Sequence, residues 1–169
     1  MSVRDALGRA LTATAAVSFL APLLTRITLG HAFFLTGRGK LEHFDNFVGF
    51  FTSLGIPAPE LNAHVVARLE YYGGIALVLG LATRLFAAAL AGTMVMAILT
   101  SEREQFVLSW LPTGEVGPTD IAPFVFFLLL AWLVLFGPGL LSLDAFIARR
   151  LGLPEARHTP AAAKLRETA

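Results

Sequence analysis

The chain has 169 residues, of which 56% are apolar and 15% are charged, and its mean hydropathy is +0.70. A typical soluble domain is about 45–50% apolar and about 25% charged, so this composition argues against an ordinary soluble enzyme and predicts an integral membrane protein. The net charge of +1 gives no indication of a nucleic-acid partner. The sequence contains no Cys, which excludes disulfides, thiol redox chemistry and thiolate metal sites within this chain.

Four apolar stretches predict membrane-spanning helices: residues 17–37, 62–82, 85–100 and 121–136. About 20 residues, rising about 1.5 Å each, cross the hydrocarbon core of a bilayer. The link Ala82-Thr83-Arg84 is short, so the second and third spans should form an antiparallel hairpin. The expected fold is therefore all-α, a bundle of four transmembrane helices formed by a membrane domain at residues 17–153.

Shorter segments flank these spans. Two of them are expected to be amphipathic helices that lie in the membrane interface. The first carries apolar residues at helical spacing, namely Phe44, Phe47, Phe50 and Phe51. The second should begin at Ser142, a residue typical of helix N-caps, and its apolar face consists of Leu143, Phe146, Ile147 and Leu151. Residues 1–16 are interpreted as an interfacial lead-in, with a signal peptide as the competing interpretation, and residues 154–169 as a polar cytoplasmic tail.

The distribution of Lys and Arg predicts the orientation of the chain. With four spans, one side carries eight basic residues: Arg4, Arg9, Arg84, Arg149, Arg150, Arg157, Lys164 and Arg166. The other side carries three: Arg38, Lys40 and Arg103. Because basic loops stay in the cytoplasm, both termini are predicted to be cytoplasmic.

Arg26 lies near the middle of the first span, where a charge costs about 2.5–3.5 kcal/mol even on an insertion scale. Counted from the cytoplasmic side, Arg26 should lie about 13 Å deep and Glu70, in the second span, about 18 Å deep. The sequence therefore predicts an ion pair between Arg26 and Glu70. Small residues share the faces of these two charges and predict a close approach of the helices: Gly30 and Gly37 on the first span, Gly73 and Gly80 on the second.

Two interpretations of these charges remain open. The pair can be a structural pin that fixes helix register, or it can line a cavity for a proton, an ion or a quinone head group. In the second case Glu70 and Arg26 are the candidate catalytic residues, acting as a proton relay. The candidate cavity residues are Arg26, His31, Tyr71, Tyr72 and Lys40. No metal site and no covalently bound cofactor are expected; a quinone is the candidate ligand.

Four segments, in order, resemble the DoxX family of small bacterial membrane proteins. They are RITLGHAFFLTGRGKL at 26–41, LGIP at 54–57, LEYYGGIALVLGLATRL at 69–85 and GPGLLSLDAF at 137–146. The positions that match recurring family residues are Arg26, Gly30, Gly37, Lys40, Glu70, Gly73, Gly74, Gly80, Arg84 and Asp144. The polar segment 101–120 shows little that can be matched, which leaves the outer loop without a family expectation.

The resemblance implies a four-helix protein of the bacterial cytoplasmic membrane with a link to membrane redox chemistry. Some relatives are subunits of quinone-linked sulfur oxidoreductases, and others associate with soluble detoxifying enzymes. The first hypothesis for this chain is thus an accessory or quinone-interacting subunit of a redox complex, with a soluble oxidoreductase partner. The alternatives are a non-catalytic scaffold or stress-response factor that docks partner enzymes, and a small-molecule transporter, which would require a homo-oligomer.

Overall fold

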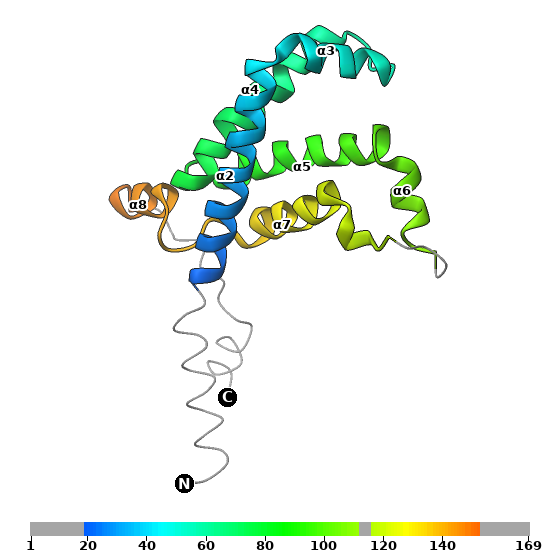
Figure 1. Ribbon diagram of the computed structural model, residues 1–169. Coiled ribbons are helices and arrows are strands. Elements are labelled where there is room, and N and C mark those ends of the chain that lie inside the picture. Colours follow the sequence, from blue (N-terminus) through cyan, green and yellow to red (C-terminus); the bar gives the residue numbers. More distant parts are fainter. Residues whose placement is uncertain (1–18, 112–115, 153–169) are drawn as a thin grey trace, which may run out of the picture.

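The computed structural model describes residues 19–111 and 116–152. These residues form seven α-helices, one 3₁₀ turn and no strand, which confirms the all-α class. Figure 1 shows their arrangement. The elements are α2 (Leu20–Glu42), α3 (Phe44–Ser53), α4 (Pro59–Leu79), α5 (Thr83–Thr100), α6 (Arg103–Leu108), η1 (Pro118–Asp120), α7 (Ala122–Phe136) and α8 (Leu143–Arg150). The expected lead-in at residues 1–16 and tail at 154–169 lie outside the described residues.

One helix in the described part of the chain is both long and apolar enough to cross a membrane by length and composition. This helix is α5, with 18 residues and a mean hydropathy of 1.6. The apolar helix α7 is shorter, with 15 residues. Helices α2 and α4 have 23 and 21 residues, but they carry more polar groups. The count of four spans therefore stays a prediction.

The helix boundaries differ from the expected ones chiefly at α2. The first span was expected to end at residue 37, with a polar connection after it, but α2 continues to Glu42. An exposed ion pair between Arg38 and Glu42, four residues apart at 2.7 Å, supports this last turn. Pro22 lies in the first turn, where no helical hydrogen bond depends on its missing N–H.

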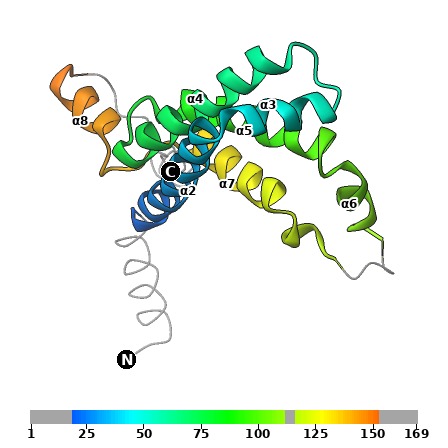
Figure 2. The same ribbon diagram turned by 45° about the horizontal axis from the view of Figure 1, so that its top comes forward.

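The long helices form two antiparallel pairs. Helix α2 runs beside α4, and α5 runs beside α7 (Figures 1 and 2). In Figure 1 the α5/α7 pair extends across the steeply running α2/α4 pair, and the short helix α3 packs over the beginning of α4. Helices α6 and α8 lie at opposite edges of the molecule.

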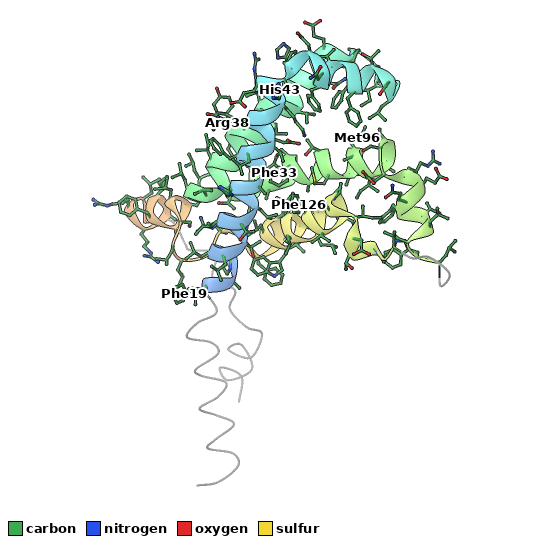
Figure 3. The ribbon with its side chains drawn as sticks, viewed as in Figure 1. Phe19, Phe33, Arg38, His43, Met96 and Phe126 are labelled. Atoms are coloured by element: carbon green, nitrogen blue, oxygen red, sulfur yellow. The ribbon has the colours of Figure 1, made fainter. Side chains whose placement is uncertain are left out.

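The two pairs meet in a buried apolar cluster. Its members are Leu29, Phe33, Leu77, Ala87, Leu90, Ala91, Met94, Leu130 and Leu133. The ring of Phe33 on α2 meets that of Phe126 on α7 edge-on, with centroids 5.6 Å apart (Figure 3), a favoured geometry for aromatic pairs. This cluster fixes how the α2/α4 pair sits on the α5/α7 pair.

Candidate functional site

Glycines allow the backbones of α2 and α4 to touch. A Cβ placed on Gly37 would lie 2.3 Å from the backbone nitrogen of Tyr71, and one on Gly74 would lie 2.5 Å from that of Phe34. Gly30 faces the carbonyl of Gly74 in the same way, at 2.7 Å. These contacts confirm the predicted small-residue seam between the two helices. Gly73, expected in this seam, instead faces Leu90 of α5, and its place is taken by Gly74, four residues after Glu70.

At one end of this seam, Glu70 is paired with Lys40. The Lys40 Nζ lies 2.6 Å from each carboxylate oxygen of Glu70. The Glu70 side chain is only 2% exposed, whereas that of Lys40 is 29% exposed. A buried carboxylate is stable as an anion only when it is paired. The pair thus joins a partly exposed Lys40 side chain to a carboxylate that is enclosed by helices.

One aromatic ring contacts this pair, and an aromatic pair lies on the neighbouring residues of α2 and α4. The Lys40 ammonium lies 4.9 Å from the centre of the Phe47 ring on α3, a favourable cation–π distance. The ring of Tyr71 packs against that of Phe34 at 5.1 Å. The arrangement provides a hydrogen-bond donor, a carboxylate and flat apolar walls within one short stretch of α2, α3 and α4. We call this group of residues the Lys40–Glu70 site: Lys40, Glu70, Phe47, Tyr71 and Phe34.

The predicted ion pair between Arg26 and Glu70 is wrong. Arg26 lies opposite Gly80, at the far end of α4, and Glu70 lies opposite Gly37. Residues 26 and 37 are about 16 Å apart along a helix. The predicted depths of Arg26 and Glu70 assumed that the cytoplasmic ends of the two spans lie at the same level. In the structure, α2 extends further at one end of the pair and α4 extends further at the other.

Arg26 belongs to a second buried cluster, where α2, the α4–α5 turn and the segment before α8 meet. Its guanidinium is fully buried and donates one hydrogen bond to the carbonyl of Leu141. Its Nε and Nη1 have no hydrogen-bond partner among the described residues. The carboxylate of Asp144 is close enough to attract it electrostatically. We call these residues the Arg26 cluster: Arg26, Gly80, Leu141, Ser142 and Asp144.

Asp144 in this cluster caps a helix that is distant in sequence. Its carboxylate accepts hydrogen bonds from the backbone N–H groups of Ala82 and Thr83, at 2.7 and 2.9 Å. These are the unpaired donors at the start of α5, where a negative charge also favours the helix dipole. Asp144 in turn donates its own N–H to the carbonyl of Gly80 at 2.9 Å. The predicted helix start at Ser142 puts Asp144 in the first turn of α8, as observed, but nothing in the sequence indicated this contact.

The remaining predicted cavity residues are not brought to one place. His31 is exposed on α2, and Tyr72 is 60% exposed on α4. Tyr71 is half-buried and lies against the seam next to Glu70. Of the five residues expected in a common cavity, Lys40 and Tyr71 are at the Lys40–Glu70 site, Arg26 is in the other cluster, and His31 and Tyr72 face outward. A single cavity holding all five is therefore wrong.

Sequence reasoning missed the role of Phe47 at the Lys40–Glu70 site and the buried ring nitrogen of His64 on the same helix as Glu70. Phe47 was expected only as part of an interfacial face. His64 was not considered; its ring stacks on Phe44 with centroids 4.0 Å apart, and its buried Nδ1 has no hydrogen-bond partner in the described part of the chain. The position of Lys40 at the seam could have been found from the sequence. One helical face continues one turn beyond the expected span and directs Lys40 towards the seam; it consists of Arg26, Gly30, Phe33, Gly37 and Lys40.

Gly80→Ala is expected to destabilise the protein by about 1–3 kcal/mol, since it combines backbone strain with overpacking. Gly80 has a φ of +69°, and an added Cβ would lie 1.7 Å from Arg26 Nη1 and 2.6 Å from Ser142 Cβ. Gly55→Ala is the matched control, because its φ is +68° and nothing lies within 4 Å of the added atom. Thermal unfolding in detergent compares them. Equal losses would show that the contact with Arg26 contributes nothing.

Comparison with known proteins identifies the family of the chain. The family model described as DoxX matches residues 21–103, which include α3, α4, α5 and all of α2 except its first residue. The protein named "Inner membrane protein YphA" of Escherichia coli (strain K12) is 34% identical over 133 residues, covering 72% of this chain and 86% of that protein. The chain belongs to the DoxX family.

A second relative has a name that refers to redox chemistry. The Bacillus subtilis (strain 168) protein named "Putative oxidoreductase CatD" is 37% identical over 78 residues. This match covers 46% of the present chain and 57% of that relative, so the chain spans little more than half its length. No solved structure matches the chain.

Proposed function

We propose that this DoxX-family protein is an accessory, quinone-interacting subunit of a redox complex in the bacterial cytoplasmic membrane. The observation that carries the proposal is the Lys40–Glu70 site, where a carboxylate enclosed by helices is paired with the ammonium group of a partly exposed lysine side chain. Quinone reduction needs a donor to the ring carbonyls and a source of protons. Lys40 supplies the donor and Glu70 the proton-exchanging group. In this proposal the two electrons come from a soluble oxidoreductase partner or from a bound flavin. This chain has no Cys to ligate an iron–sulfur cluster of its own.

The walls of the site suit a quinone ring. Ligand sites are mostly apolar and aromatic, with a few placed polar groups. Phe47 covers Lys40, and the Tyr71–Phe34 pair flanks the adjoining part of the seam. Arg26, part of the relay expected from sequence, has no role in this proposal, since it lies at the other end of α4.

The membrane arrangement in this proposal has four spans, α2, α4, α5 and α7, with both termini in the cytoplasm. Its support is the distribution of side chains. Each of these helices exposes large apolar residues, including Leu24 at 59%, Leu85 at 70% and Leu135 at 68%, whereas Arg26 and Glu70 are buried between helices. Apolar surface of this extent faces lipid more readily than water. Helix α7, at about 22 Å, needs its flanking residues or local thinning of the bilayer to cross.

The proposal is tested by extracting the protein from its own membrane in polymer-bounded lipid discs and measuring the quinone that accompanies it. Lys40→Gln and Glu70→Gln are each expected to lower the quinone-to-protein ratio several-fold, since they remove the charge-assisted contacts. Arg68→Gln is the control, because Arg68 is exposed on the same helix as Glu70. Equal ratios in all variants, with unchanged elution profiles, would refute quinone binding at this site.

A scaffold without redox activity is the second candidate. The observation that favours it is that both buried charge clusters tie elements together: Lys40 joins α2 to α4, and Asp144 joins α8 to α5. In that case Glu70→Gln should reduce the amount of folded protein in the membrane as much as it reduces the amount of quinone recovered with the protein. A variant at normal abundance that has lost quinone would count against the scaffold.

A further inference from the structure

Helix α8 is held to the rest of the protein at one end only. Asp144 binds the α4–α5 turn through three hydrogen bonds, and Arg26 holds the preceding carbonyl of Leu141. Ser142 caps α8 itself, accepting a hydrogen bond from the backbone of Ala145 at 3.1 Å, as the sequence predicted. Beyond this first turn the helix stands apart from the other helices in both ribbon views (Figures 1 and 2).

The apolar face of α8 stays exposed among the residues that the structure describes. Phe146, Ile147 and Leu151 are 55%, 42% and 66% exposed, and Leu143 is 39% exposed. The last turn carries Arg149 and Arg150, and the Arg150 guanidinium lies 5.2 Å from the centre of the Phe146 ring. The one acidic residue of the helix, Asp144, is occupied by the start of α5. The residues of α8 beyond Asp144 therefore combine an apolar face with two basic side chains.

We propose that α8 is a surface anchor that inserts its apolar face between lipids and binds anionic phospholipid head groups through Arg149 and Arg150. Charge complementarity selects this occupant. An amphipathic helix with basic residues binds at the boundary between head groups and acyl chains, and each Arg near an anionic surface strengthens binding about fivefold. A second copy of this chain would bring the same positive charges together. The Asp144 contact keeps the anchor at a fixed position beside the α4–α5 turn.

The insertion of α8 can be measured on the full chain, because the protein has no Cys. A nitroxide label at Ile147→Cys reports whether dissolved oxygen, which is enriched in lipid, or a water-soluble nickel chelate reaches it more readily. The protein is placed in phosphatidylcholine vesicles with and without phosphatidylglycerol. We expect oxygen to be favoured, and more strongly when phosphatidylglycerol is present.

Charge variants separate lipid binding from simple exposure. Replacing Arg149 and Arg150 with Gln is expected to shift the inserted population about 25-fold towards the released one and to abolish the effect of phosphatidylglycerol. Replacing both with Lys keeps the charge and should change little. Three results would overturn the proposal. The first is a label that the chelate reaches more readily in both membranes, and the second is a label shielded from both reagents, as under a second copy. The third is a label whose accessibility is the same in the Gln variant.

The mobility of the label at position 147 tests whether Asp144 fixes the position of α8. Asp144→Ala should increase the rotational mobility of the label at position 147, while the unfolding of the bundle stays a single cooperative transition. The substitution removes a cap, which weakens α5 but leaves its apolar contacts in place. An unchanged label spectrum in this variant would show that Asp144 does not position α8.

Discussion

Replacing Lys40 with Met is expected to destabilise the folded protein by about 3–5 kcal/mol, because it leaves the Glu70 carboxylate buried without a partner. Glu70 is 2% exposed, and both of its carboxylate oxygens are bound by Lys40. The carboxylate would then have to take up a proton or draw in water. The measurement is the free energy of unfolding in detergent, with the yield of monodisperse protein as a second readout.

The double variant Lys40→Met, Glu70→Met should recover most of this loss, since an apolar pair of similar volume replaces the buried ion pair. Arg38→Gln is the matched control on the same helix. Arg38 pairs with Glu42, but the two side chains are 58% and 53% exposed, and an exposed pair contributes little. A Lys40→Met protein as stable as the Arg38→Gln protein would mean that Glu70 is not enclosed as the structure shows.

Gly37→Ala is expected to separate α2 from α4 and to destabilise the protein by about 1–3 kcal/mol, the usual effect of overpacking, or more. The added Cβ would lie 2.3 Å from the nitrogen and 2.7 Å from the Cα of Tyr71. These are backbone atoms, so no side-chain rotation relieves the overlap. Because Lys40 and Glu70 lie beside this contact, the variant should also lose quinone from the Lys40–Glu70 site. Both effects are measured on the same purified sample.

Gly39→Ala provides the control two residues further along α2. An added Cβ at Gly39 meets nothing within 4 Å, so the substitution should be neutral or stabilise the helix by up to about 1 kcal/mol through its better helix propensity. If both substitutions were neutral, α2 and α4 would not pack backbone to backbone in the membrane. If both destabilised, an effect on this segment other than the contact with Tyr71 would be responsible.

Regular local patterns made much of the fold predictable. Apolar runs and turn residues gave helices close to those observed, with the third expected at residues 85–100 and found as Thr83–Thr100. The cap at Ser142 was predicted from residue type alone. Gly30 and Gly37 were assigned to a close helix contact by their spacing, and the structure confirms it. These features depend on residues a few positions apart, which a sequence displays directly.

The partners of the buried charges depend on the register of α2 against α4, and local sequence patterns do not reveal this register. Glu70 could pair with Arg26 or with Lys40, since all three face the seam. The choice rests on which residues lie opposite each other when two antiparallel helices pack. The contacts of Gly37 with Tyr71 and of Gly80 with Arg26 decide it in favour of Lys40. A shift of one helix by a few turns would reverse the result without changing either helix.

The sequence by itself therefore determined that this protein is an all-α member of a membrane family, where its four long helices begin and end to within five residues, and which charged residues needed partners. The tertiary structure alone decided that Lys40 pairs with Glu70, that Arg26 belongs to a separate cluster, and that Asp144 caps α5 from 61 residues away. The physical reason is that helix formation follows from neighbouring residues, whereas a buried charge is stabilised by whatever group the packing of distant segments places within hydrogen-bonding distance.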